Sequence, residues 1–336
     1  MTKATSSGLE GVVVAETAIS HVDGERGQLV IAGADVEQLA ATSSYEAAAA
    51  RVLTAGGIAI DGAQLGRLVP YGARPLDVMA LLVPVAGLAD QSRRDGRPDA
   101  IVARFRQLVP LLAAALAPDF APAVVTRALG AGSVAEIATR ALDLDDSFTP
   151  TLDMVFILLA DHELNASSFA ARVAASTEAD PYACVAAALA TLSGSRHGAA
   201  SEAIARFADE IGGPDHVRSA VRALRKRGEN PPGFGHPLYP GGDPRAPPLL
   251  EVARGTANRR ARTILALVDA MADVALPTVD VGMAALTAAL GLVPPAATGM
   301  FGVSRAAGWL AHVLEQRAAG YVLRPRARYT GIAVTP

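Results

Sequence analysis

Three histidines in the middle of the chain stand where packing alone would not require them. His162 lies in Ala-Asp-His-Glu-Leu-Asn, His197 in Ser-Arg-His-Gly, and His236 in Gly-Phe-Gly-His. A single histidine at a helix end is more often held by a backbone carbonyl than used in catalysis. Imidazole, however, titrates near neutral pH and can donate or accept a proton at little cost. Three such positions in one stretch therefore favour a catalytic use.

A metal site is the first alternative, because histidines and a carboxylate can ligate zinc. Zinc ligands usually come as close pairs, whereas the three histidines are 35 and 39 residues apart. Cys184 is the only cysteine and lies in an apolar run. We therefore expect no metal.

Asp280 is the candidate carboxylate. It stands in Leu-Pro-Thr-Val-Asp-Val-Gly, just before a long apolar segment. One interpretation is an ordinary helix N-cap. The other is a general base, which needs desolvation because a carboxylate with a pKa of about 3.9 is a weak base. The apolar neighbours provide that desolvation.

Arg245, Arg305 and Arg324 are candidate anion-binding residues. A guanidinium binds a carboxylate through two parallel hydrogen bonds, so the three would suit a dicarboxylate substrate. Only two of the 30 basic residues are lysine, so any one arginine could equally be an ordinary surface cation.

Composition excludes several classes of protein. The 336 residues are 51% apolar but only 4% aromatic, and alanine-rich runs suit closely packed helices. A net charge of −3 creates no field that would attract nucleic acid. One cysteine permits no internal disulfide, and residues 1–8 lack the apolar stretch of a signal peptide. We expect a cytoplasmic protein.

One uncharged segment, Val281–Val303, is long enough to suggest a membrane span. It contains prolines and glycines, and an aspartate precedes it. We interpret it as a buried helix, a turn at Gly291–Pro295 and the start of a second helix.

The first part of the chain predicts a small β element, and the remainder predicts helices. Strand-like pieces are Val12–Val14, Thr17–Ile19 and Leu29–Ile31, with a turn at Asp23–Glu25. Apolar residues at three- and four-residue spacing then predict helices over Ser44–Ala55, Arg74–Ala89, Ala100–Leu116, Leu152–Ala175, Asp180–Leu192, Ser201–Ile211, Pro214–Arg227, Pro247–Met271, Val281–Leu290 and Ser304–Gln316. Plausible N-caps are Ser44, Asp180, Ser201 and Ser304. The fold class is all-α, with ten or more helices.

A long loop, Gly228–Pro248, contains seven prolines and five glycines. A loop of this length inside a compact protein is usually functional or disordered. Because His236 and Arg245 lie in it, we expect a functional loop. Glycine has no Cβ, so the backbone of Gly233-Phe234-Gly235 could approach a ligand closely.

Several segments together resemble the citrate synthase family, and they run from one end of the chain to the other. They are Gly8–Gly24, Ala160–Arg172, Ser193–Ile204, Gly233–Ala246, Thr278–Val281 and Phe301–Gly331. The resemblance implies a two-domain helical fold and a homodimer. Residues 1–200 and 291–336 would form a large domain with the dimer contact and part of the active site. Residues 201–290 would form a small domain on the coenzyme A side, with catalytic His and Asp residues.

The resemblance also implies a reaction, the condensation of acetyl-CoA with oxaloacetate as in the tricarboxylic acid cycle. Asp280 would remove a methyl proton, His197 would stabilise the enolate, and His236 would polarise the ketone. Citryl-CoA would then be hydrolysed to citrate and coenzyme A. The resemblance assigns oxaloacetate binding to His162, Arg245, Arg305 and Arg324, one arginine coming from the other subunit. Gly233, Phe234 and Gly235 would contact the coenzyme, which is a substrate, so no separate cofactor is implied.

The chain departs from the family pattern around these residues. Ala199 replaces a glycine after His197, and Arg196 adds a charge. The segment after His236 reads Pro-Leu-Tyr-Pro, which lacks two basic residues expected near the coenzyme phosphates. Three alternatives stay open. One is 2-methylcitrate synthase, because Ala199, Val281 and Gly282 would alter the volume around the acyl group. Another is a citryl-CoA lyase-like enzyme, because the same residues serve the carbon–carbon step in both directions. The third is a non-catalytic regulatory or assembly paralogue.

Overall fold

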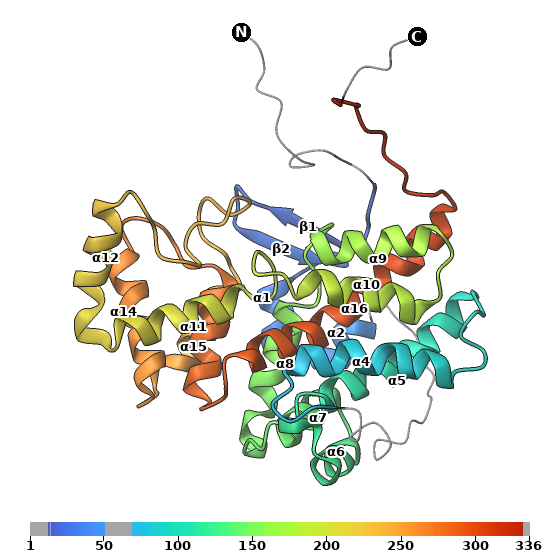
Figure 1. Cartoon of the computed structure of the whole chain (residues 1–336), viewed down its shortest axis with the longest axis horizontal. Helices are drawn as coiled ribbons and strands as arrows, with labels where there is room; N and C mark the ends of the chain where they lie inside the picture. The colour runs from blue at the N-terminus through green and yellow to red at the C-terminus, as the bar shows by residue number, and fades with distance from the viewer. Residues whose placement is uncertain (1–12, 14, 51–68, 332–336) are drawn as a thin grey trace.

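The computed structural model describes residues 13, 15–50 and 69–331. These residues form 15 α-helices and one small three-stranded sheet near the N-terminus, as Figure 1 shows. The prediction of a helical fold with a small N-terminal β element is confirmed.

The sheet consists of β1 (Ser20–Asp23), β2 (Gln28–Ile31) and β3 (Ala34–Asp35), antiparallel in the order β1-β2-β3. The predicted piece at 29–31 is a strand, but the piece at 17–19 is not, because β1 starts at Ser20. Most of the piece at 12–14 lies outside the described residues. The β1–β2 turn presses against the loop that carries His236. A Cβ at Gly24 would lie 1.9 Å from the carbonyl oxygen of Leu238.

The helices follow in chain order. They are α1 (Val36–Thr42), α2 (Tyr45–Ala50), α4 (Pro75–Ala89), α5 (Pro98–Ala114), α6 (Pro122–Leu129), α7 (Val134–Ala141), α8 (Thr149–Leu158), α9 (Ala166–Ser176), α10 (Pro181–Leu192), α11 (Ala200–Ile211), α12 (Val217–Lys226), α13 (Ala246–Arg254), α14 (Arg259–Met271), α15 (Val279–Ala289) and α16 (Pro295–Ala319). Proline occupies the first turn of several of them, where its missing N–H costs nothing. The predicted continuation of α2 over residues 51–55 lies outside the described residues.

Two predicted helices are each two helices in the structure. The predicted helix 152–175 breaks between α8 and α9, where Glu163 adopts a φ of 50°. The predicted helix 247–271 breaks between α13 and α14, where Asn258 caps the new helix by accepting from the N–H of Ala261. Periodicity alone missed both breaks, because the apolar spacing continues across them.

The predicted caps were right in two of four cases. Asp180 accepts from the N–H of Ala183 at 3.0 Å, and Ser44 accepts from the N–H of Ala47 at 3.2 Å. Ser304 lies inside α16, where its hydroxyl bonds the carbonyl of Met300 at 2.7 Å. Ser201 likewise lies inside α11, which begins one residue earlier.

The uncharged segment 281–303 folds as the sequence predicts. Helix α15 ends at Ala289, Gly291 makes the turn with a φ of +73°, and α16 begins at Pro295. Among the helices of the described residues, none is both long and apolar enough to span a bilayer.

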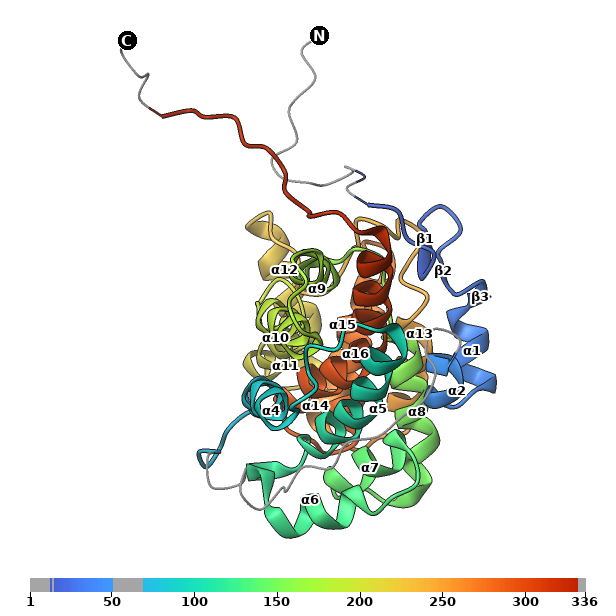
Figure 2. The ribbon, with the colours of Figure 1, turned by 90° about the vertical axis from the view of Figure 1, so that its right-hand side faces the viewer.

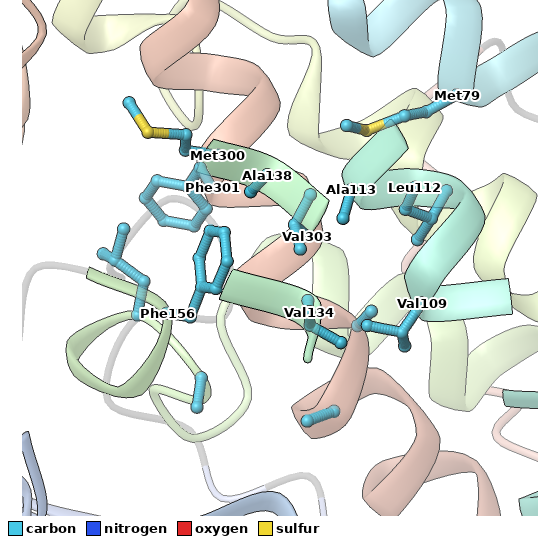
Figure 3. Packing of buried hydrophobic residues seen from close by; sticks show 14 of the residues in the cluster. Met79, Val109, Leu112, Ala113, Val134, Ala138, Phe156, Met300, Phe301 and Val303 are labelled. Atoms are coloured by element: carbon cyan, nitrogen blue, oxygen red, sulfur yellow. The ribbon is translucent and has the colours of Figure 1, made fainter. Parts of the chain in front are cut away.

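Helix α16 lies among the other helices in the middle of the molecule in Figures 1 and 2, and many of its residues belong to the main hydrophobic core. Met300, Phe301 and Val303 of this helix pack among residues such as Phe156 and Met79 in Figure 3. Two further clusters of buried apolar residues gather around α11 to α15, at one end of the molecule in Figure 1. Several residues of α13 and α15 also belong to the main core. The division into residues 1–200 with 291–336 and residues 201–290 stays a prediction.

Candidate active site

His162 is positioned by the break between α8 and α9. The preceding carboxylate, Asp161, is fully buried, accepts from the hydroxyl of Ser20, and lies 3.2 Å from Nε2 of His312. Glu163 has a positive φ, and its carboxylate accepts from the N–H of Val22 in β1 at 2.5 Å. The break is therefore held from both sides by the sheet and α16.

His236 is positioned by backbone pairing between its loop and the segment before α15. The N–H of Gly235 donates to the carbonyl of Leu276, and the N–H of Thr278 donates to the carbonyl of Gly233, both at 2.9 Å. This pairing holds the Gly-Phe-Gly segment beside the start of α15, which carries Asp280.

Gly233 and Gly235 provide a matched pair of stability predictions. Both have a positive φ, +86° and +79°. A Cβ at Gly233 would lie 2.5 Å from Ile204 and 2.7 Å from Val281, whereas one at Gly235 meets only Ala275 at 3.9 Å. Gly233→Ala therefore combines backbone strain with overpacking, and we expect it to lower the free energy of unfolding by about 3 kcal/mol. Gly235→Ala should lower it by about 1 kcal/mol.

Urea unfolding of both variants measures the two losses of unfolding free energy. Equal losses of unfolding free energy for the two would contradict the packing argument, because the backbone strain is shared and the clash is not.

The histidine rings of the two loops meet. The ring centroids of His162 and His236 are 5.6 Å apart, nearly perpendicular. Nε2 of His162 lies 2.9 Å from the hydroxyl of Tyr239. Burial, together with the charges of Arg245 and Arg305, lowers the pKa of His162 well below its usual value. His162 is therefore neutral at pH 7.

His236 also has a defined proton position. Its Nδ1 accepts from the N–H of Leu238 at 3.1 Å, so in the neutral ring the proton is on Nε2. Burial, with Arg245, lowers the pKa of His236 as well. His236 can thus act as a neutral hydrogen-bond donor through Nε2.

His197 lies against α9 and α16. Its Nε2 is 2.8 Å from the hydroxyl of Ser167, which also accepts from the indole N–H of Trp309 at 3.1 Å. Its ring meets that of Phe301 edge-on, with centroids 5.9 Å apart. Burial, with Arg305, lowers the pKa of His197 to about 4.

Two of the three predicted arginines are buried next to these rings. Arg245 is 3% exposed and makes two 2.8 Å hydrogen bonds to the carboxylate of Asp243. Arg305 is 1% exposed, and its Nε donates to the carbonyl of Leu159 at 2.7 Å. Its buried Nη1 has no hydrogen-bond partner. Burial lowers the pKa of Arg305 to about 10. We call His162, His197, His236, Arg245 and Arg305 the cluster. It therefore contains a cation, Arg305, with one N–H donor that has no acceptor.

Arg324 is not part of this cluster. It is exposed in the extended segment after α16, which leaves the body of the molecule in Figures 1 and 2. A single chain therefore does not bring it to the other candidate residues.

Asp280 lies in the first turn of α15, and the N-cap is Thr278, so the interpretation of Asp280 as an N-cap is wrong. The Thr278 hydroxyl donates to Asp280 over 3.5 Å. Burial raises the pKa of Asp280 to about 6, with the charge of Arg245 opposing. The charge of Asp280 in turn acts on Arg245 and Arg305. This carboxylate is a stronger base than an exposed one.

Several residues that contact the cluster were not selected from the sequence. Tyr239, Asp243 and Ser167 have no distinctive spacing, although each lies within eight residues of a selected one. Of the three substitutions that could alter the acyl-group volume, Val281 is fully buried, and a Cβ at Gly282 would lie 3.0 Å from Leu249 of α13. Val281 directly follows Asp280, and the effect of all three on the acyl group stays a prediction.

The rings of the cluster and the carboxylates near them do not form a metal site. Within the part of the chain that the structure describes, no three His, Cys, Asp or Glu side chains gather closely enough to hold a metal ion.

Comparisons with known proteins identify the class to which this fold and site belong. The model of the citrate synthase family (citrate synthase, C-terminal domain) matches residues 8–326. The chain belongs to the citrate synthase family, whose members are condensing acyltransferases.

The relatives carry two different names. The chain is 33% identical to a citrate synthase of Haloferax volcanii, covering 96% of this chain and 95% of the relative. It is 30% identical to a 2-methylcitrate synthase of Mycobacterium tuberculosis, covering 96% and 90%. Its structure resembles the crystal structure of citrate synthase from Thermotoga maritima with a TM-score of 0.79 at 25% identity, covering 99% and 98% of the two chains.

Proposed function

We propose that this protein condenses acetyl-CoA with oxaloacetate to give citrate and coenzyme A. The observation that carries the proposal is Asp280, a partly buried carboxyl group with a raised pKa whose charge acts on two buried arginines. A base of this strength suits removal of a proton from carbon, and the arginines suit a dicarboxylate acceptor.

The first step is enolate formation. Asp280 takes a proton from the methyl group of the thioester, and the negative charge moves to the thioester oxygen. His197 donates a hydrogen bond to that oxygen. For this its Nδ1 must carry the proton. The Ser167 hydroxyl must then turn its proton from Oδ1 of Asn165, to which it donates at 2.8 Å, toward Nε2 of His197, which is also 2.8 Å away. A donor placed before charge develops stabilises the transition state without reorganisation.

The second step forms the carbon–carbon bond. The enolate carbon attacks the ketone carbon of oxaloacetate, and the ketone oxygen receives the Nε2 proton of His236. The neutral tautomer of His236 supports this role. Arg305, Arg245 and His162 bind the carboxylates and the ketone region, and Gly233, Phe234 and Gly235 approach the coenzyme. Water then hydrolyses citryl-CoA, releasing citrate and the free thiol of coenzyme A.

We further propose that the active form is a homodimer in which Arg324 of one copy completes the site of the other. The extended, exposed segment after α16, which leaves the body of the molecule in Figures 1 and 2, supports this. Residues 201–290 would close over residues 1–200 and 291–336 and exclude water during the reaction.

A thiol-release assay tests the proposal. Purified protein is supplied with acetyl-CoA or propionyl-CoA, with and without oxaloacetate, and free thiol is measured. We expect release that requires oxaloacetate and is faster with acetyl-CoA. Faster turnover of propionyl-CoA would favour 2-methylcitrate synthase. Cleavage of citryl-CoA without thiol release would favour a lyase. No turnover and no coenzyme A binding by calorimetry would favour a non-catalytic paralogue.

The pH dependence of kcat/KM follows from the pKa of Asp280, about 6. The reaction needs the unprotonated carboxylate, so kcat/KM should rise tenfold per pH unit below that pKa and level off above pH 7. Steady-state rates between pH 4.5 and 8.5 check this. A profile that is flat down to pH 5 would mean that Asp280 is not the base.

A further inference from the structure

Tyr239 is the residue that joins the candidate substrate-binding groups to one another. It is 2% exposed although its loop is largely exposed. Its hydroxyl lies 2.9 Å from Nε2 of His162, its ring centroid is 5.0 Å from that of His236, and the guanidinium carbon of Arg245 lies 5.7 Å from its ring centroid. One side chain thus touches three candidate site residues from two loops.

The loop backbone fixes this side chain in place. The N–H of Tyr239 donates to the carbonyl of His236, and its carbonyl accepts from the N–H of Gly242, both at 3.0 Å. The β1–β2 turn closes the other side, because Gly24 packs on the carbonyl of Leu238. The hydroxyl therefore has little freedom to turn away from His162.

Both partners of the hydroxyl contact are neutral. Burial raises the pKa of the Tyr239 phenol, and burial lowers the pKa of His162. A neutral imidazole has one donor and one acceptor nitrogen, and the phenol can pair with either kind, so the contact holds the ring in both tautomers. His162 lies between α8 and α9, whereas Tyr239 belongs to the loop before α13, so the bond also links the two loops.

We propose that Tyr239 is a positioning residue for the keto acid: its hydroxyl holds the ring of His162 in the orientation that binds oxaloacetate, while its ring supports His236 and Arg245. This inference rests on the proposed function and adds to it a residue that touches the binding groups and not the acyl-CoA. Its loss should therefore weaken keto acid binding selectively.

The test is Tyr239→Phe, which removes one oxygen and keeps the ring, compared with Tyr71→Phe, whose side chain is 93% exposed. A buried imidazole left without its partner should raise the KM for oxaloacetate, and its Kd by calorimetry, about tenfold. The KM for acyl-CoA should change less than about twofold, since no acyl-CoA contact is removed. Tyr71→Phe should match the wild type.

A second measurement reports on His162 directly. In ¹⁵N-histidine-labelled protein, Tyr239→Phe should move the Nε2 resonance of His162, assigned with a His162→Asn variant, even if stability also changes. An unchanged Nε2 resonance, or a fall in kcat with both KM values unchanged, would overturn the inference. Wild-type protein that neither binds nor turns over oxaloacetate would instead refute the proposed function.

Discussion

Asp280→Asn is expected to lower kcat about a thousandfold or more while leaving the Kd of oxaloacetate within about twofold of the wild type. The amide has nearly the same shape as the carboxylate but cannot accept a proton from carbon. The raised pKa of Asp280, about 6, reflects a desolvated group, so an uncharged amide is also tolerated there without loss of stability. Single-turnover rates and calorimetry with oxaloacetate measure the two quantities separately.

The matched control is Asp269→Asn, because Asp269 is an exposed carboxylate on the neighbouring helix α14. It should behave as the wild type. Retention of more than a tenth of the wild-type kcat in Asp280→Asn would show that another group removes the proton, and Asp280 would lose its role as general base.

Arg305→Gln is expected to raise the Kd of oxaloacetate at least a hundredfold, because a buried charge-assisted contact to a carboxylate is lost. Its effect on folding should be much smaller. In the free protein one guanidinium nitrogen is buried without a hydrogen-bond partner, and an unsatisfied buried donor costs free energy. Replacing it removes that cost, which offsets the loss of the bond to Leu159.

Calorimetry with oxaloacetate tests the predicted loss of binding, and a thermal unfolding curve tests the predicted small effect on folding. Arg225→Gln on the exposed face of α12 is the control for the loss of one positive charge. An unchanged Kd would exclude Arg305 from the substrate site. A large fall in Tm together with weak binding would mean that Arg305 acts mainly on the fold.

Local sequence signals were sufficient for most of the helices. Apolar spacing located α4, α10 and α11 to within a few residues, because each buries apolar residues at three- and four-residue spacing, and α15, which is buried on nearly all sides, was located equally well. The same signal failed at residues 159–165, where the chain leaves the helix although apolar residues continue. The cause is a set of tertiary contacts. Asp161 accepts from the hydroxyl of Ser20 and lies against His312, and Glu163 accepts from the N–H of Val22 in β1.

Prediction of the candidate site from the sequence is limited in the same way, because local signals do not show which side chains meet in space. Residue type and family resemblance selected His162, His197, His236, Asp280 and two buried arginines. They could not select Tyr239 or Ser167, since nothing in a linear sequence shows that a phenol lies 2.9 Å from one imidazole or a hydroxyl 2.8 Å from another. Equally, only packing shows that Gly282 lies against Leu249 of α13.

The sequence by itself determined which chemical groups this protein has and where most of its helices lie, because both depend largely on residue type and local spacing. Only the tertiary structure decided how these groups are charged and oriented. Burial raises the pKa of Asp280 and lowers those of the three histidines, and it leaves one nitrogen of Arg305 without a partner. Desolvation depends on every atom packed around a group, and those atoms come from all parts of the chain.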